Sequence, residues 1–380
     1  MQTNYGIKGA QMTSSTGSIV ARAAVARTVS APAMLENIVV PAPGPGEARV
    51  KILASGVCHT DLSCMNGVFG TDGFPFLLGH EGAAIVESVG EGVTNVAEGD
   101  FVILAWRAPC GECRFCLAGK PNLCSASLNA TQKMTAESDG AVLNAVLGIG
   151  TFCEYTLVHA KQCVPVSDQL PPEQMSLIGC GVMTGVGAAL YSAKVEPGSS
   201  VAVFGCGGVG DSVIMGARQA GATTIIAVDL DPKKLEWAKA FGASHTVNPN
   251  DGDPVAAIKA ITNGYGVNFS FEAVGRADTL KQAIFSRDLA GTCVLIGVAG
   301  PSAVLNDLSL GQFFDVGGNL RVSWYGDCLP TRDFPMLASW YEQGRLDLDR
   351  VVSRTMPLDG VNEAFDLMKA GETLRSVLVF

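Results

Sequence analysis

The stretch SVAVFGCGGVGDSVIMGARQAGATTIIAVD, residues 200–229, decides the fold. A short apolar run leads into Gly205-x-Gly207-x-x-Gly210, a helical pattern follows, and a second apolar run ends at Asp229. A strand, a glycine-rich turn, a helix and a second strand closed by an acid form the dinucleotide-binding fingerprint. We expect Gly205 to make the turn, Gly207 to let the backbone approach a pyrophosphate, and Gly210 to allow close packing of helix on strand.

The acidic residue at the end of this stretch predicts the cofactor. Asp229 would accept hydrogen bonds from both hydroxyls of an adenosine ribose and would repel a 2′-phosphate, so NAD is favoured over NADP. Lys234 is placed to flank the ribose, and Gly208 and Val209 lie in the same loop, where the helix N-terminus would face the phosphates. A glycine-rich turn in an ordinary α/β core is the alternative interpretation of the motif alone.

Strand and helix patterns alternate on both sides of this motif. The segments that show it are 182–193 and 233–242, which read as helices, and 266–275 and 291–300, which read as strands. Such alternation predicts βαβ units and a doubly wound parallel sheet, a Rossmann domain over residues 182–324. Val298, at the end of the last strand, is a further expected cofactor contact.

The N-terminal third of the chain has a different pattern, of short strands cut by turns. Examples are RVKILASGV (49–57), AAIVESVG (83–90) and DFVILAW (100–106). Helical patterns and a final strand, LRSVLVF, return after residue 325. The simplest arrangement is a nucleotide-binding domain inserted into a β-rich domain made of residues 19–181 and 325–380. Residues 1–18 are polar and small, and we expect a flexible N-terminal extension.

The net charge and the cysteine content of the chain disfavour some classes of function and favour others. Lys and Arg total 26 against 36 Asp and Glu, so the net charge of −10 disfavours nucleic-acid binding. No run of consecutive apolar residues predicts a membrane span, and no secretory signal is evident. Twelve cysteines without such a signal indicate metal or thiol chemistry in a reducing compartment, and we expect a cytoplasmic protein.

Four of these cysteines lie in one short run, PCGECRFCLAGKPNLC (109–124). Four thiolates at this spacing can surround one tetrahedral Zn²⁺, which leaves no position for substrate, so the expected site is a structural zinc site. A pair of disulfides and an iron–sulfur cluster are the alternatives. The expected ligands are Cys110, Cys113, Cys116 and Cys124.

Three further motifs make the family resemblance specific: GVCHTDL (56–62), GHEG (79–82) and GCGVMTG (179–185). Together with the cysteine run and the NAD fingerprint, they resemble the zinc-dependent medium-chain alcohol dehydrogenases over essentially residues 20–380. That resemblance implies a GroES-like catalytic domain beside the Rossmann domain. Stretches such as NATQKMT (129–135) and SWYGDCLP (323–330) are similar to the branch of mycothiol-dependent formaldehyde dehydrogenase and S-nitrosomycothiol reductase.

The resemblance implies a second, catalytic zinc ion held by Cys58, His80 and Cys180, with the fourth position open to water or substrate. Glu81 is then an acid beside the metal that can approach it transiently, and Arg375 is its partner and a cofactor contact. Without the resemblance, the cysteines read as small buried residues and His80 with Glu81 as a simple hydrogen-bonded pair.

The same resemblance assigns roles around the metal. Asp61 would accept from the second imidazole nitrogen of His80, Thr60 would bond the substrate hydroxyl, and His59 would lie near the pyrophosphate. Many family members end their proton relay with a His where this chain has Ser63. Because Ser is not a base near neutral pH, the proton would pass to water or to His59.

The resulting hypothesis is an NAD- and zinc-dependent interconversion of a primary alcohol and its aldehyde in a cleft between the domains. The formaldehyde adduct S-hydroxymethyl-mycothiol is one expected substrate, and aromatic or allylic primary alcohols without a thiol are the alternative. A non-catalytic NAD-binding protein is a third interpretation. The resemblance further implies a homodimer or homotetramer, often joined edge to edge through the nucleotide-domain sheets.

Overall fold

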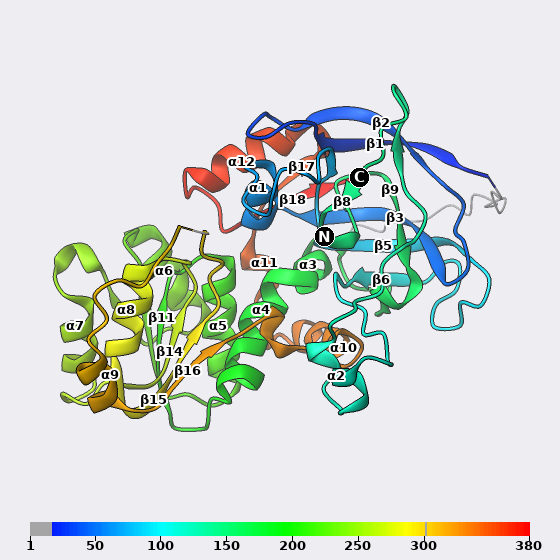
Figure 1. Ribbon diagram of the computed structural model, residues 1–380. Helices are drawn as coiled ribbons and strands as arrows, with labels where there is room; N and C mark the ends of the chain where they lie inside the picture. Colours follow the sequence, from blue (N-terminus) through cyan, green and yellow to red (C-terminus); the bar gives the residue numbers. More distant parts are fainter. Residues whose placement is uncertain (1–16, 301) are drawn as a thin grey trace, which may run out of the picture.

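The computed structural model describes residues 17–300 and 302–380, so the predicted extension lies outside the described residues except for its last two. Two parts lie side by side, a parallel α/β part and a β-rich part, and the helix that runs from α3 to α4 lies between them (Figure 1). The described chain forms a mixed α/β structure of the expected class.

The parallel sheet has the strand order β13-β12-β11-β14-β15-β16, which is the doubly wound order 3-2-1-4-5-6. Every neighbouring pair in it is parallel. In such a sheet ligands bind beyond the carboxyl ends of the strands, where the order reverses between β11 and β14. The strands are β11 (Ser200–Phe204), β12 (Thr224–Val228), β13 (His245–Val247), β14 (Val267–Glu272), β15 (Arg287–Leu295) and β16 (Asn319–Val322).

Side chains of the central strands alternate between two apolar layers. In β11, Val201 and Val203 pack with α5 and α4, whereas Ala202 and Phe204 pack on the opposite face, near α7 and α8. This period of two explains why the central strands read as continuous apolar runs, since both faces are covered. The helices of this part are α5 (Gly208–Gln219), α6 (Pro232–Phe241), α7 (Pro254–Ile261), α8 (Ala277–Phe285) and α9 (Leu310–Val316).

The β-rich part contains two sheets. One has the order β7-β2-β1-β4-β8, and the other has the order β10-β6-β5-β3-β18-β17, with β9 also paired to β3. The strands are β1 (Ile19–Ala26), β2 (Met34–Val40), β3 (Glu47–Gly56), β4 (Phe76–Leu77), β5 (Gly82–Val89), β6 (Phe101–Leu104), β7 (Thr135–Ala136), β8 (Asn144–Ala145), β9 (Tyr155–His159), β10 (Cys163–Pro165), β17 (Val352–Pro357) and β18 (Arg375–Val379).

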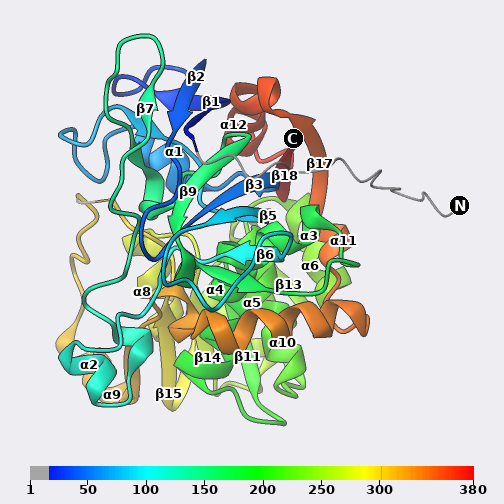
Figure 2. The same cartoon turned by 90° about the vertical axis from the view of Figure 1, so that its right-hand side faces the viewer.

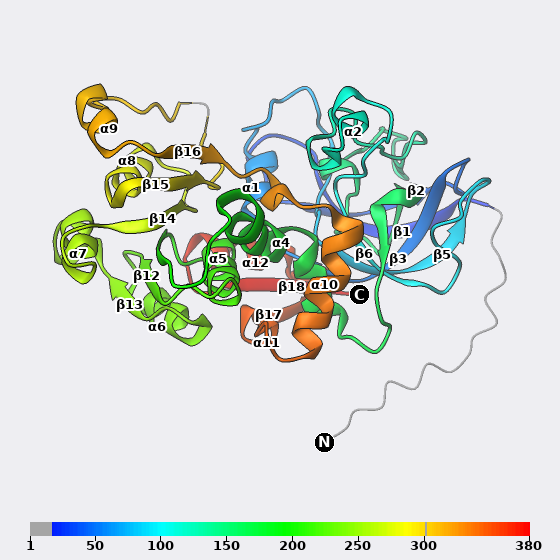
Figure 3. The same cartoon turned by 90° about the horizontal axis from the view of Figure 1, so that it is seen from below.

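The C-terminal segment completes this second sheet. β18 pairs antiparallel with β3 and parallel with β17, so residues 352–379 return to the strands of the N-terminal third (Figure 3). The helix α12 contacts β17 and β18 (Figure 2). The helices of this part and of the junction are α1 (His59–Met65), α2 (Arg114–Leu117), α3 (Pro172–Leu177), α4 (Met183–Gly187), α10 (Pro330–Glu342), α11 (Leu348–Val351) and α12 (Val361–Lys369).

One continuous helix, Pro172–Ala193, joins the two parts. The predicted helix 182–193 is the second half of it. One π-helical turn, η4 (Ile178–Val182), separates α3 from α4, and a second, η5 (Ala188–Ala193), ends the helix. Its length and mean hydropathy would suit a membrane span, but 78% of its most apolar window is buried inside the protein. We therefore regard it as a core helix.

A buried carboxylate, Glu47, fixes the loop before β3. Its oxygens accept hydrogen bonds from the N–H of Gly44, the N–H and hydroxyl of Thr131, and the N–H and side chain of Gln132. Burial alone would raise the pKa of Glu47, but these donors outweigh it and lower the pKa to about 2. Replacing Glu47 with Gln is expected to destabilise the protein by about 3 kcal/mol at neutral pH.

The pH dependence gives that prediction its sign. The folded-state pKa lies below the ordinary value of 4.5, so the carboxylate stabilises the fold above pH 4.5 and this gain is lost as the pH falls toward 2. Urea unfolding midpoints of wild type and Glu47→Gln should differ strongly at pH 7 and much less near pH 3. An equal difference at both pH values, or the same loss in the exposed control Glu98→Gln, would contradict it.

Candidate active site

The four cysteines of the short run converge in the structure. The sulfurs of Cys110, Cys113, Cys116 and Cys124 all lie within 4.8 Å of one another. Left-handed glycines turn the chain on either side of α2, with φ of 86° at Gly111 and 72° at Gly119. The N–H groups of Cys110 and Cys113 donate to sulfurs of the same cluster, each at 3.3 Å.

The chemistry of this cluster fits a cation. Backbone hydrogen bonds from Cys116 and Ser125 lower the pKa of Cys113 to about 5. Desolvation, with hydrogen bonds to the neighbouring thiols, raises the pKa of Cys116 to about 12. Four thiolates together therefore need the charge of a metal ion, and a tetrahedral zinc ion matches four sulfur ligands.

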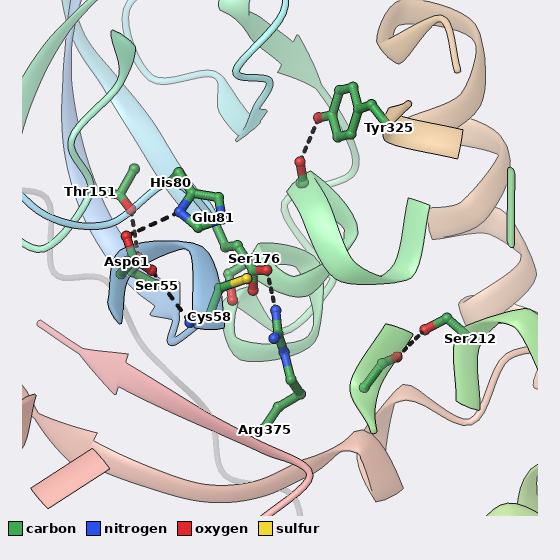
Figure 4. A network of polar contacts seen from close by, with 12 residues as sticks. Ser55, Cys58, Asp61, His80, Glu81, Thr151, Ser176, Ser212, Tyr325 and Arg375 are labelled. Carbon is green, nitrogen blue, oxygen red and sulfur yellow. Dashed lines mark hydrogen bonds and ion pairs between the residues drawn. The ribbon is translucent and has the colours of Figure 1, made fainter. Parts of the chain in front are cut away.

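A second cluster brings together residues that are far apart in the sequence (Figure 4). Ligand atoms of Cys58, His80, Glu81 and Cys180 lie within 4.8 Å of one another. Cys58 is the N-cap of α1, His80 lies between β4 and β5, and Cys180 lies in the π-helical turn η4. This is the set that the resemblance implied, and the structure also places Glu81 in it.

The imidazole of His80 is oriented as a metal ligand requires. Its Nδ1 lies 3.1 Å from Oδ1 of Asp61, and its Nε2 is buried without a hydrogen-bond partner among the described residues. Asp61 is itself held by the N–H groups of Gly79 and Cys58. A buried ring nitrogen that faces two thiols and has no partner fits a bound cation.

The thiols of Cys58 and Cys180 interact directly with each other. A hydrogen bond from Cys180, opposed by burial and assisted by the charges of His80 and Arg375, lowers the pKa of Cys58 well below its ordinary value. The thiol of Cys58 thus lies beside the imidazole of His80. Two thiolates and one imidazole form the donor set of a catalytic zinc site with one open position.

Arg375 connects this cluster to the dinucleotide loop. Its guanidinium pairs with Glu81, and both side chains are buried. The same side chain lies against the start of α5, since a Cβ on Gly208 would lie 2.7 Å from Cδ of Arg375. The candidate metal ligands and the predicted cofactor loop therefore meet at one residue.

The dinucleotide loop has the backbone that its glycines predict. Gly205 has φ of 93°, and a Cβ on Gly210 would lie 1.8 Å from the carbonyl oxygen of Gly205. A Cβ on Gly207, the N-cap of α5, would meet nothing within 4 Å, so this side of the loop is open. Oδ2 of Asp229 accepts from the N–H of Cys206 at 2.8 Å, which places the acid beside the loop.

Arg375 brings a positive charge to the N-terminus of α5. Desolvation lowers the pKa of His59, and the charges of Arg375 and Lys234 lower it further against the opposing charge of Cys58. Such a surrounding suits a pyrophosphate. Val298 is exposed in the loop after β15, and Val209, Thr60 and Ser63 are partly buried.

Sequence reasoning missed one residue at the second cluster, Tyr325. Its hydroxyl donates to the carbonyl of Gly179 at 2.5 Å, directly before Cys180 (Figure 4). Its ring packs on Trp106 with centroids 4.1 Å apart. No spacing or motif pairs these residues, so only the tertiary structure could reveal them.

The comparisons with known proteins identify the family. The family described as alcohol dehydrogenase GroES-like domain matches residues 44–168, and the family described as zinc-binding dehydrogenase matches residues 208–343. The chain is 42% identical to the class-3 alcohol dehydrogenase of Myxine glutinosa, over 94% of this chain and 97% of that protein. The chain belongs to the zinc-dependent medium-chain alcohol dehydrogenases.

Two other similar proteins place this dehydrogenase among enzymes with different named substrates. It is 41% identical to the S-(hydroxymethyl)glutathione dehydrogenase of Escherichia coli O1:K1 / APEC, over 94% of this chain and 99% of that protein. The crystal structure of benzyl alcohol dehydrogenase from Acinetobacter calcoaceticus matches it with a TM-score of 0.88 at 33% identity, covering 95% and 99% of the chains. The predicted fold and enzyme class are confirmed, and the mycothiol branch stays a prediction.

Proposed function

We propose that this dehydrogenase binds two zinc ions and NAD and interconverts a primary alcohol and its aldehyde, with the formaldehyde adduct of a low-molecular-weight thiol as substrate. One observation carries the proposal. The ligand atoms of Cys58, His80 and Cys180 lie within 4.8 Å of one another, and Arg375 links that cluster to the glycine-rich loop. The four-cysteine cluster would hold the second, structural ion.

The chain would bind NAD along the carboxyl edge of the parallel sheet. The α5 N-terminus with Arg375 would hold the pyrophosphate, and Asp229 would accept the ribose hydroxyls. Lys234 would flank that ribose, and Val298 would contact the nicotinamide half. When bound, NAD supplies the acceptor for a hydride.

The metal ligands would serve the alcohol. When bound, zinc supplies Lewis acidity that brings the pKa of an alcohol hydroxyl toward neutrality. Thr60, in the first turn of α1, would accept the hydroxyl proton and pass it on, and Asp61 would keep the ring of His80 in one orientation. Ser63 follows one turn later and is no base, so the proton would leave to water or to His59.

The identity of the thiol is the finer part of the proposal. The relative named S-(hydroxymethyl)glutathione dehydrogenase supports a formaldehyde–thiol adduct, and the stretches quoted above favour mycothiol as the thiol. Aromatic or allylic primary alcohols are the second candidate class. The neighbour named benzyl alcohol dehydrogenase and the aromatic cluster of Trp106, Trp324 and Tyr325 beside Gly179 favour it.

Assembly and location complete the proposal. Every residue of the edge strand β16, Asn319–Val322, is exposed. We propose a homodimer or homotetramer in which the edges of two such sheets join, and a cytoplasmic location. Sedimentation of the purified protein would report the oligomeric state.

Substrate competition tests the proposed function. Purified protein with NAD is offered formaldehyde with mycothiol, with glutathione or with no thiol, and separately benzyl alcohol, and NADH absorbance is followed. We expect mycothiol to raise the rate with formaldehyde about 100-fold over formaldehyde alone. A higher kcat/KM for benzyl alcohol would establish the second class instead. No NADH from any substrate, with zinc below two ions per chain, would indicate a non-catalytic protein.

A further inference from the structure

Arg107 is a buried cation without an acidic partner. It is 7% exposed, and no carboxylate forms an ion pair with it in the described chain. One guanidinium nitrogen donates to the carbonyl of Cys124, a member of the four-cysteine cluster. A buried guanidinium needs nearby negative charge to offset its desolvation.

The four-cysteine cluster lies where it can supply part of that charge. Four groups favour the protonated guanidinium, Cys124, Cys328, Tyr325 and Cys116, and two of them belong to the cluster. Four thiolates around one divalent zinc ion carry a net charge of about −2. Because its guanidinium donates to the carbonyl of Cys124, Arg107 lies where a counter-ion of the loaded cluster belongs.

The other side of Arg107 faces an aromatic layer. Its guanidinium carbon lies 3.9 Å from the ring centroid of Trp324, a stacked cation–π contact. Trp106 packs edge-on against Trp324 at 6.2 Å and on the ring of Tyr325 at 4.1 Å. The contacts thus continue from the four-cysteine cluster into the segment 324–327.

That segment has an unusual backbone. Tyr325, Gly326 and Asp327 have φ of 56°, 65° and 50°, so three consecutive residues are left-handed. A tyrosine holds this conformation only where its surroundings determine it. They do so here, because Ser192 donates to Asp327 at 2.7 Å and a Cβ on Gly187 would lie 2.4 Å from the carbonyl oxygen of Gly326.

The end of this chain of contacts is the Cys180 ligand. Cys180 lies in a π-helical turn, where the N–H of Met183 donates to the Cys180 carbonyl and the Gly179 carbonyl accepts the hydroxyl of Tyr325. π-helical turns often occur at functional sites, where they redirect a side chain. The buried hydroxyl of Tyr325 therefore determines the position of the turn that presents the thiol.

We propose that Arg107, Trp324 and Tyr325 form a positioning bridge through which a metal ion in the four-cysteine cluster holds Cys180 in place for the metal ion of the second cluster. This inference rests on the proposed function, since it requires both ions. It makes the ion in the four-cysteine lobe a determinant of the second site as well as of local stability. The three side chains act through Gly179 and are positioning residues.

Zinc release from the holoenzyme tests the bridge. A chromogenic chelator is added and the release of each ion is followed, with Cys58→Ala protein assigning the phase that belongs to the four-cysteine ion. Tyr325→Phe removes only the hydroxyl, so we expect the ion of the second cluster to leave at least 10-fold faster while the other phase and the unfolding midpoint are unchanged. Tyr341→Phe is the matched control, since the hydroxyl of Tyr341 donates to Asp349.

Arg107 variants separate charge from stacking. Arg107→Leu should accelerate both phases, whereas Arg107→Lys should restore retention of the four-cysteine ion and leave the other ion labile, because Lys keeps the charge and loses the planar stack. Removal of the four-cysteine ion should also change tryptophan fluorescence in wild type. Arg345→Leu is the control, since the guanidinium carbon of Arg345 stacks 4.6 Å from the ring centroid of Trp340 and Arg345 belongs to neither cluster.

The outcomes are distinguishable. If wild type holds two zinc ions but Tyr325→Phe releases them at the rates of its control, the bridge alone is overturned. The same holds if Arg107→Leu accelerates the release of the four-cysteine ion only. Fewer than two zinc ions per wild-type chain would overturn the bridge and the proposed function together. If Arg107→Leu does not fold, the Tyr325→Phe comparison decides.

Discussion

Cys58→Ala is expected to reduce kcat/KM by a factor of about 1,000 or more, because the open metal position then loses one of its protein ligands. Cys58 lies with His80 and Cys180 in the second cluster, and no other thiol there can replace it among the described residues. The four-cysteine cluster is untouched. Metal analysis of the variant should therefore find one zinc ion per chain instead of two.

Cys64→Ala is the matched control for this prediction. Cys64 lies on the same helix, α1, and burial raises the pKa of its thiol to about 12, so it is a protonated packing residue. The control should keep two zinc ions and most of the turnover. Full activity in Cys58→Ala, or two ions retained in that variant, would show that the reaction does not use this cluster.

The second large effect is expected from a pair of glycine substitutions in the dinucleotide loop. In Gly210→Ala, the new methyl group would lie 1.8 Å from the carbonyl oxygen of Gly205, so helix and strand must separate. We expect a loss of about 3 kcal/mol of stability, and the loop should no longer bind NAD. Thermal unfolding and titration with NAD measure the two effects.

Gly207→Ala separates cofactor binding from folding. A Cβ at this position meets nothing within 4 Å, so the unfolding midpoint should stay near that of wild type. The methyl group would stand on the open side of the loop, where the pyrophosphate is expected, and NAD affinity should fall about 100-fold. Unchanged NAD affinity in this variant would show that the phosphates bind elsewhere.

The local features of this molecule could be predicted from the sequence. Residues 200–229 carry the complete strand–turn–helix–strand unit, and the four cysteines lie within 15 positions, so chain connectivity alone brings them together. The structure shows the expected turn at Gly205 and the cysteine cluster. The strand predicted at 291–300 starts earlier, at Arg287, and ends at Leu295, because the Gly-rich end turns away from the sheet.

The second cluster could be predicted only through the family resemblance. Cys58, His80 and Cys180 come from a helix N-cap, a loop and a π-helical turn, and no periodicity relates them. The π-helical turns were not expected, since an apolar helix pattern gives the same signal with or without them. The left-handed backbone of Tyr325 was missed for a similar reason. Tertiary contacts determine its conformation, and its local sequence does not favour it.

The position of β18 has a consequence for biosynthesis. This strand lies between β3 and the edge strand β17 of its sheet, and it also carries Arg375. A ribosome therefore completes the parallel domain, residues 200–322, well before it delivers the strand that closes the surrounding sheet. A nascent chain that stops short of residue 375 lacks both that strand and the guanidinium that pairs with Glu81 and lies against Gly208.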